Sequence, residues 1–334
     1  MTKSEPLFVA ISDVHFSPQN LHVASRALIT ACQHAERLGV PLVIAGDLND
    51  TKAIIRAEVA NQLISIFKYS TCQKYVLVGN HDLINEKGQE HSLNFLEPWA
   101  TIIDQPKVFP GLPEVFFVPY QSDTEKLLRI LDPPRTEKIY VMHQGFRGAF
   151  MGDYAVDKSS IDISEVAHVK VISGHYHRHQ TIGTVTYIGN PFTVSFGEAN
   201  DGPKGFLVVN TDGSYEQIPL KLRKHVKVEA YTNGESLMVL VPNTNEEDFV
   251  WLKLSGPKST LNKITKKEMS KYFGHENFKL DKIPLNSVES KADMKNLKDE
   301  EVLDAIINET PEGEVLKEYL KKLWREVMYE NSAV

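Results

Sequence analysis

The sequence predicts an α/β fold for the first two thirds of its 334 residues. Two observations lead to this prediction. Short runs of β-branched and other apolar residues alternate with longer stretches of helical periodicity, and the runs are continuous, as in strands covered on both faces. Several of these runs are followed at once by polar residues of the kinds that bind metals. In α/β sheets, functional sites lie at this position, beyond the carboxyl ends of the strands.

The expected helices and strands follow one another in regular order along this part of the chain. One helix is expected from about residue 21 to 38, because apolar residues such as Val23 and Leu28 recur on one helical face. A second helix is expected from about residue 52 to 67. Apolar runs predict strands at residues 7–12, 41–45, 74–78, 115–119, 138–142, 169–173 and 184–188.

The character of the sequence changes near residue 222, and we expect four regions. These are a large domain that carries the chemistry at 1–221, a small α+β accessory domain at 222–285, a polar linker at 286–298 and a helical tail at 299–334. In the accessory domain, strands are predicted at 226–231, 236–241, 249–254 and 278–283. One helix is predicted there at 259–273, with Ser259 or Thr260 as its N-cap.

The composition is that of an ordinary globular protein rather than a membrane or secreted one. No apolar run approaches the ~20 residues that a membrane-spanning helix needs, and the first residues lack the apolar stretch of a signal peptide. The two cysteines, Cys32 and Cys72, are expected to be reduced, as in a cytoplasmic protein. The net charge of −7 argues mildly against a nucleic-acid partner, although bound divalent cations would invert the local field.

Seven potential metal ligands follow the predicted strands in five short motifs. Carboxylate, amide oxygen and imidazole in this mixture suit a pair of divalent transition metals, a device that cleaves phosphate esters. Residues two apart at a strand end, as in the first and last motifs, point to the same face. The ligands are Asp13 and His15 in D-V-H, Asp47 in G-D-L-N-D, Asn80 in G-N-H-D, His143 in M-H-Q-G, and His175 and His177 in G-H-Y-H.

Two further residues are candidates for proton transfer. His81, next to Asn80, is the predicted general acid for a leaving alkoxide, because imidazole titrates near neutrality. The Asp50 carboxylate is expected to accept the other ring N–H of His81 and fix the tautomer. Asp47, with two carboxylate oxygens, is expected to bridge both metals. Asp82 is expected only to stabilise its turn.

The order of these motifs over residues 8–177 resembles the calcineurin-like metallophosphoesterases, whose series is D-x-H, G-D-x-x-D, G-N-H-D/E, H and G-H-x-H. Residues 187–206 are similar to the corresponding segment of SbcD-type nucleases, including the small phage members that act in DNA recombination and repair. The resemblance implies a two-sheet α/β/β/α sandwich. It also implies that Asp13, His15, Asp47 and His177 hold one metal, that Asp47, Asn80, His143 and His175 hold the other, and that His81 is catalytic.

The same resemblance implies an activity and an assembly. The expected activity is manganese-dependent cleavage of DNA, with magnesium as the alternative: a 3′-to-5′ exonuclease on duplex ends and an endonuclease on single strands. The accessory domain would cap the site and contact DNA. The expected assembly is a homodimer bound to an SMC-like coiled-coil ATPase of SbcC type, in the cytoplasm of a bacterial or phage-infected host cell.

Three functions remain open at this point. The chain departs from many cellular SbcD-type proteins, which have histidine where it has Asp50, and the phosphatase branch uses aspartate there. The alternatives to a nuclease are therefore a small-substrate phosphodiesterase or phosphoprotein phosphatase, and a non-catalytic scaffold of the same fold. A scaffold is expected to lose ligands, whereas every ligand position here is filled.

Two amphipathic segments are candidates for contacts with partners. The apolar face of the second helix, with Val59, Leu63, Ile66 and Phe67, would either pair across a two-fold axis or pack on the chain's own sheet. An apolar stripe at 313–329 in the tail would dock either on the ATPase or on the chain's own core.

Overall fold

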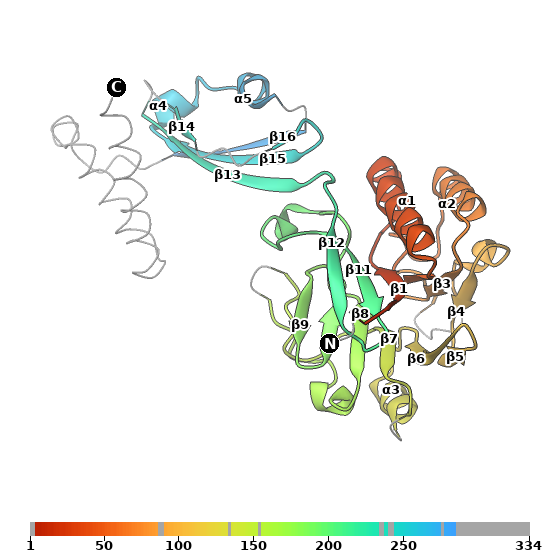
Figure 1. Cartoon of the computed structure of the whole chain (residues 1–334). Helices are drawn as coiled ribbons and strands as arrows, with labels where there is room; N and C mark the ends of the chain where they lie inside the picture. The colour runs from red at the N-terminus through yellow and green to blue at the C-terminus, as the bar shows by residue number, and fades with distance from the viewer. Residues whose placement is uncertain are drawn as a thin grey trace.

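The computed structural model describes residues 4–85, 90–132, 135–152, 155–233, 237–239, 244–274 and 277–284. Within them, two six-stranded sheets form the larger part of the chain and a four-stranded sheet forms the rest (Figure 1). The predicted tail at 299–334 and linker at 286–298 lie outside the described residues.

The first sheet has the strand order β12-β11-β1-β2-β3-β4. The strands β1 to β4 are parallel, and β11 and β12 add antiparallel pairs at one edge. Their bounds are β1 Pro6–Ile11, β2 Leu42–Ile44, β3 Lys74–Leu77, β4 Thr101–Ile103, β11 Gly205–Asn210 and β12 Tyr215–Pro219.

The second sheet has the strand order β5-β6-β7-β8-β10-β9, with parallel strands at its centre and antiparallel strands at both edges. Its strands are β5 Lys107–Phe109, β6 Leu112–Val118, β7 Ile139–His143, β8 Lys170–Gly174, β9 Gln180–Ile182 and β10 Val185–Tyr187.

All seven strands predicted within residues 1–221 are present in the two sheets, with ends shifted by up to three residues. Five strands of the two sheets were not predicted: β4, β5, β9 and β12 are short or polar, whereas β11 is an apolar run that was missed.

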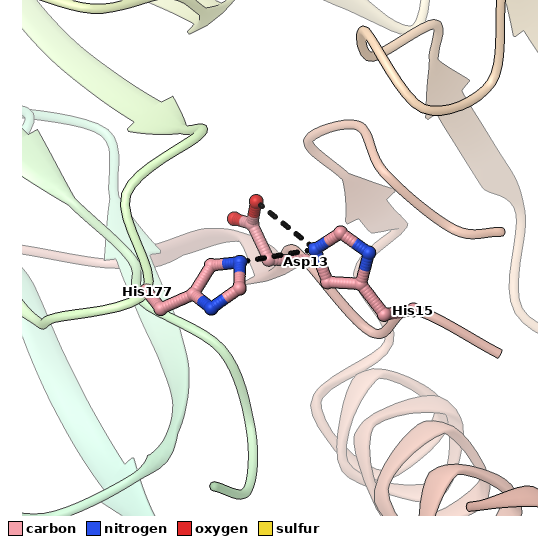
Figure 2. A group of neighbouring side chains, drawn as sticks. All are labelled: Asp13, His15 and His177. Atoms are coloured by element: carbon pink, nitrogen blue, oxygen red, sulfur yellow. Dashed lines mark hydrogen bonds and ion pairs between the residues drawn. The ribbon is translucent and has the colours of Figure 1, made fainter. Parts of the chain in front are cut away.

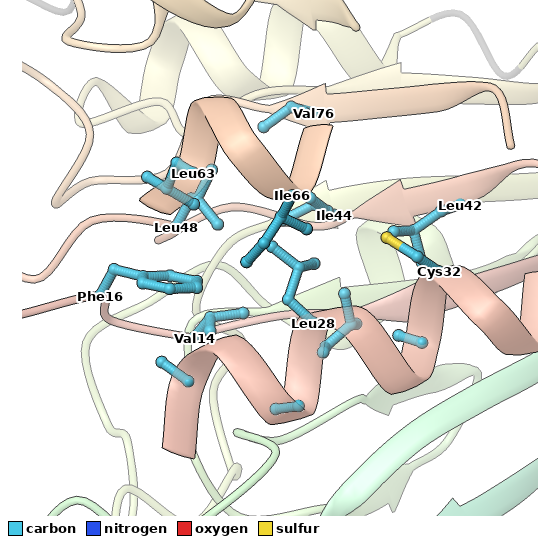
Figure 3. Packing of buried hydrophobic residues seen from close by; sticks show 14 of the residues in the cluster. Val14, Phe16, Leu28, Cys32, Leu42, Ile44, Leu48, Leu63, Ile66 and Val76 are labelled. Atoms are coloured by element: carbon cyan, nitrogen blue, oxygen red, sulfur yellow. The ribbon is translucent and has the colours of Figure 1, made fainter. Parts of the chain in front are cut away.

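Three apolar layers stabilise an α/β/β/α sandwich: one lies between the two sheets, and one covers the outer face of each sheet. Alternate side chains of β1 separate the layers: Phe8 faces the second sheet, whereas Val9 faces the helices. The helices α1 (Leu21–Leu38) and α2 (Ala57–Tyr69) cover the outer face of the first sheet (Figure 3). The helix α3 (Thr124–Leu131) and a 3₁₀ turn at Ile163–Val166 cover the second. The prediction of this sandwich is confirmed.

The two covering helices differ in how well the sequence predicted them. Helix α1 has the predicted bounds, and it ends at Gly39, which takes a left-handed conformation with φ 67°. Helix α2 begins five residues later than predicted, because the loop beyond β2 continues through Ala53, whose φ of 61° is incompatible with a right-handed helix. Its apolar residues, proposed above for a dimer contact, are instead buried in the chain's own core: Val59, Leu63, Ile66 and Phe67.

The third sheet has the strand order β14-β13-β15-β16 and one covered face. Alternate residues of β15 are buried, and they pack against two short helices. The single helix predicted at 259–273 was wrong: it is interrupted at residues 262–265, and Thr265, not Ser259 or Thr260, caps the second helix through a capping box with Glu268. The elements are β13 His225–Thr232, β14 Leu237–Val239, β15 Phe249–Gly256, α4 Lys258–Leu261, α5 Lys266–Phe273 and β16 Phe278–Pro284.

Across the described ranges, none of the helices is long and apolar enough to cross a membrane. Both cysteines are free thiols, and Cys32 lies on the buried face of α1 (Figure 3).

Candidate metal centre

The seven candidate ligands lie together at the carboxyl ends of five strands. Strands β1, β2 and β3 of the first sheet and β7 and β8 of the second supply them, so the cluster spans one end of the sandwich. The loops after β1 and β2 stay paired beyond the sheet, because Asp13 N–H donates to Gly46 O at 3.1 Å and His15 N–H donates to Asp47 O at 3.1 Å. This pairing brings the first two motifs side by side.

The first group consists of Asp13, His15 and His177 (Figure 2). Nε2 of His15 lies 3.0 Å from Nε2 of His177 and 4.0 Å from a carboxylate oxygen of Asp13. Two imidazole nitrogens and a carboxylate therefore converge on one point from strands that belong to different sheets.

The second group contains Asp47, Asn80, His143 and His175. Nε2 of His143 is 3.3 Å from Oδ2 of Asp47 and 3.0 Å from Oδ1 of Asn80. Nδ1 of His175 is 2.9 Å from the same Asn80 oxygen. Asp47 lies between the two groups, because its Oδ2 is also 3.9 Å from Nε2 of His15.

The hydrogen bonds of His143 show that this group suits a cation. Its Nδ1 is 2.7 Å from Ala45 O, a carbonyl that only accepts, so Nδ1 carries a proton. Nε2 is the ring nitrogen that faces the Asp47 and Asn80 oxygens, so either a proton or a cation can lie between them. A divalent cation can take the place of that proton, because imidazole, carboxylate and amide oxygen are suitable donors. In the first group, the buried Nδ1 of His15 has no hydrogen-bond partner.

The main chain is strained at the ligands. Four of the five non-glycine residues with positive φ in the described part of the chain are predicted ligands: Asp13 (52°), His15 (49°), Asp47 (51°) and His175 (93°). Such conformations cost on the order of 1–3 kcal/mol each and gather at functional sites. The tight turns after the strands therefore aim these side chains inward at the expense of stability.

Two glycines leave the space that the ligands occupy. A Cβ on Gly79 would collide with the side chain and main chain of Asp47. A Cβ on Gly46 would collide with the ring of His143, and its φ of 92° also favours glycine.

Opposing electrostatic effects act on the buried groups. Burial raises the pKa of Asp47, but the neighbouring imidazoles of His143 and His15 outweigh it and hold that pKa well below its usual value. Burial lowers the pKa of His143, yet the Asp47 carboxylate raises it overall to about 9. Burial, followed by the charge of His143, lowers the pKa of His175 to about 4. Asp47 is thus a carboxylate at neutral pH, ready to attract cations.

His81 lies at the mouth of the cluster, partly exposed, with its ring centroid 4.8 Å from that of His15. The main-chain oxygen of Asp50, 2.7 Å from Nδ1, accepts the ring N–H of His81. The prediction that the Asp50 carboxylate does this was therefore wrong: that carboxylate is half-exposed and lies 3.6 Å from Nδ1 of His15 instead. A ring nitrogen of His81 also lies within 4.8 Å of potential ligand atoms of His15 and Asp47, so His81 could act as a ligand as well.

Asp82 stabilises its turn, as expected. It is fully buried, and its two oxygens accept the N–H groups of Asn49 at 3.1 Å and Gly79 at 2.9 Å. This carboxylate therefore joins the loop after β2 to the loop after β3.

Three residues beside the ligands were not found from the sequence. The ring of Tyr120 lies 5.9 Å from that of His175. Glu198 accepts a hydrogen bond from Nδ1 of His177 at 2.7 Å, and the Lys204 ammonium donates to the main-chain oxygen of His177 at 2.8 Å. Glu198 and Lys204 lie within the segment 187–206 that carried the second resemblance, but no periodicity or spacing distinguished them there.

The segment around Glu198 also contacts the third sheet. Thr193 Oγ1 accepts the main-chain N–H of His225 at 2.7 Å, and the ring of Phe196 packs edge-on against Trp251 at 5.4 Å. A second connection is the ion pair between Arg26 on α1 and Glu247, with two N–O distances of 3.0 and 2.8 Å.

Comparison with known proteins agrees with this geometry. Residues 6–179 match the family model of the calcineurin-like phosphoesterases. The chain is 28% identical over 260 residues to the "Putative phosphoesterase 244L" of Invertebrate iridescent virus 6, covering 71% of this chain and 89% of that protein. It is 24% identical over 210 residues to the "DNA double-strand break repair protein Mre11" of Methanocaldococcus jannaschii. It is 25% identical over 205 residues to "Exonuclease subunit 1" of Enterobacteria phage T4. The last two matches cover 55% and 54% of this chain and 56% of each relative.

Proposed function

The chain belongs to the calcineurin-like phosphoesterase family, and we propose that it is a metal-dependent DNA nuclease, the nuclease subunit of an SbcCD-type complex. The family binds two divalent metals and hydrolyses phosphoesters, and the clustered carboxylates and imidazoles could hold them. The observation that carries the DNA part of the proposal is the similarity to one protein named for DNA double-strand break repair and one named an exonuclease subunit.

The residues of the site have separate tasks in this proposal. Asp13, His15 and His177 would hold one cation, Asn80, His143 and His175 the other, and Asp47 both. Bound there, two divalent cations, most simply Mn²⁺, would neutralise phosphate charge and activate a water nucleophile. His81 would donate the proton from Nε2 to the leaving 3′ or 5′ oxygen, since its Nδ1 is held by Asp50 O.

The proposal extends to the assembly. We propose a homodimer that binds DNA and an SMC-like coiled-coil ATPase, with residues 299–334 as the ATPase-binding tail. The exposed apolar side chains of the two covering helices, Ile29, Leu38 and Tyr69, replace the buried residues of α2 as candidates for the dimer contact. Sedimentation of the full chain at micromolar concentration tests this: particles of twice 37.7 kDa are expected, and the monomer mass alone contradicts it.

Cleavage assays test the activity. The purified chain is incubated with linear duplex DNA, circular single-stranded DNA and bis(p-nitrophenyl) phosphate, each with Mn²⁺, Mg²⁺ or EDTA. We expect Mn²⁺-dependent release of nucleotides from the duplex and linear strands from the single-stranded circle. The Glu165→Gln variant, altered at an exposed carboxylate, is the matched control and should behave as wild type.

Three results would replace the proposal with an alternative. If bis(p-nitrophenyl) phosphate is hydrolysed rapidly and both DNA substrates stay uncleaved, the chain is a small-substrate phosphodiesterase. Mn²⁺ binding without hydrolysis of these diesters or of the monoester p-nitrophenyl phosphate would assign a scaffold, and hydrolysis of the monoester alone would assign a phosphatase.

A further inference from the structure

Behind the first group of ligands lies a buried carboxylate that no proposed step uses. Glu198, at the end of the 3₁₀ turn Phe196–Glu198, is only 8% exposed. One of its oxygens lies 2.7 Å from Nδ1 of His177. Nε2 of the same ring points toward His15 and Asp13 (Figure 2).

The other contacts of Glu198 determine which way its hydrogen bond with His177 runs. Its second oxygen accepts the main-chain N–H of Val194 at 3.0 Å and the side-chain amide of Asn190 at 2.9 Å, with the Lys204 ammonium 3.6 Å away. Every one of these partners is a donor. Because donors surround its second oxygen, the carboxylate accepts there, and in its contact with Nδ1 of His177 the ring donates the hydrogen bond.

We propose that Glu198 is a positioning residue, whose carboxylate holds a proton on Nδ1 of His177 and so presents the Nε2 lone pair to a metal. Carboxylates that act in this way orient metal-binding histidines, and their loss costs about 10- to 100-fold in metal affinity. Lys204 assists by donating to the main-chain oxygen of the same residue at 2.8 Å, so both the ring and the backbone of His177 are held. The metal-binding part of this inference rests on the proposed function, whereas the hydrogen bond between Glu198 and His177 does not.

The Glu198→Gln variant separates this role from simple packing, because glutamine keeps the shape and loses one acceptor. The Val194 N–H cannot become an acceptor, so the glutamine carbonyl oxygen must stay beside it. The glutamine NH₂ then faces Nδ1 of His177. The neutral His177 ring must then accept this N–H with the lone pair of Nδ1, so its own proton moves to Nε2. A protonated Nε2 has no lone pair left to bind a metal.

The first measurement is the tautomer of His177 in the metal-free protein, read from ¹⁵N NMR of the ring nitrogens at alkaline pH. We expect Nδ1–H in wild type and in the exposed control Glu165→Gln, and Nε2–H in Glu198→Gln. Nε2–H in wild type would overturn the inference, whatever the variant does. This readout needs neither metal nor DNA, so it stands apart from the test of nuclease activity.

The second measurement is Mn²⁺ binding by calorimetry and electron paramagnetic resonance. In Glu198→Gln, one of the two sites should weaken by about 10- to 100-fold, and the site of Asn80, His143 and His175 should keep its affinity. Two sites of wild-type affinity in the variant would overturn the inference. Normal Mn²⁺ binding in wild type without DNA cleavage would instead count against the proposed function.

Discussion

At the scale of single residues, Asp47 has the most constrained position in the cluster. It lies between the two groups of candidate ligands, and its main chain is left-handed with φ 51°. The main-chain N–H of His81 donates to its Oδ1 at 2.8 Å. Loss of this carboxylate removes negative charge from both groups at once.

Asp47→Ala is therefore expected to weaken both Mn²⁺ sites and to abolish cleavage. Calorimetry with Mn²⁺ gives the stoichiometry, and thermal unfolding of the metal-free variant establishes that it is folded. Two bound ions with wild-type affinity, together with retained activity, would rule out Asp47 as the bridge.

His81 differs from Asp47 in that its proposed task needs no metal contact. His81→Ala should retain both Mn²⁺ ions and DNA affinity while the cleavage rate falls by about 10²–10⁴, the usual contribution of a general acid. Single-turnover cleavage at saturating Mn²⁺ measures the rate, and calorimetry measures the metals. If one Mn²⁺ is lost with the activity, His81 is a ligand, a role its position beside His15 and Asp47 also permits.

At the scale of elements, the loop before β8 is held by one buried carboxylate. Asp157, 3% exposed, accepts the N–H groups of Ser159 and Ser160 at 2.8 and 3.0 Å and the hydroxyl of Tyr176 at 2.6 Å. Tyr176 lies between the candidate ligands His175 and His177 in the sequence. Burial raises the pKa of Asp157, but these hydrogen bonds outweigh it and hold that pKa far below its usual value.

Because the pKa of Asp157 is lower in the folded chain than in the unfolded one, its contribution to stability is present above the unfolded pKa of about 3.9. Asp157→Asn should lower the free energy of unfolding by about 2 kcal/mol at pH 7. The difference from wild type should shrink as the pH falls below about 4, toward the folded pKa. Urea unfolding from pH 7 to pH 2 measures it.

Asp162→Asn provides the matched control, because Asp162 accepts the same kind of hydrogen bonds from Ser164 but is exposed. A smaller effect is expected there. An equal effect of the two substitutions, or a constant difference at every pH, would contradict the role of Asp157.

The elements also show what the sequence could predict. Continuous apolar runs identified the buried parallel strands, and turns after them identified all seven candidate ligands, because both signals are local. The start of α2 was misplaced since the left-handed Ala53 leaves no compositional mark. The acceptor for His81 is a main-chain oxygen, which every residue possesses, so residue type could not reveal it. Glu198 reaches His177 across 21 residues, and only the folded chain brings them together.

At the scale of the whole molecule, the tail provides a test of the assembly. Deleting residues 299–334 should leave Mn²⁺-dependent cleavage intact, because every candidate ligand lies before residue 178. The truncated chain should no longer co-purify with the proposed ATPase partner or show ATP-stimulated degradation of duplex DNA. Co-purification at wild-type affinity would show that the ATPase binds elsewhere.

One short segment joins the metal centre to the third sheet, since Thr193 and Phe196 contact that sheet and Glu198 contacts His177. Any coupling through it must be reciprocal: the factor by which docking of the sheet strengthens Mn²⁺ binding equals the factor by which Mn²⁺ strengthens docking. Phe196→Ala should then lower Mn²⁺ affinity without touching a ligand, and Mn²⁺ should slow hydrogen exchange in β13 and β15 of wild type. A ligand that binds the third sheet would, by the same thermodynamic cycle, change the affinity of the proposed metal centre for Mn²⁺.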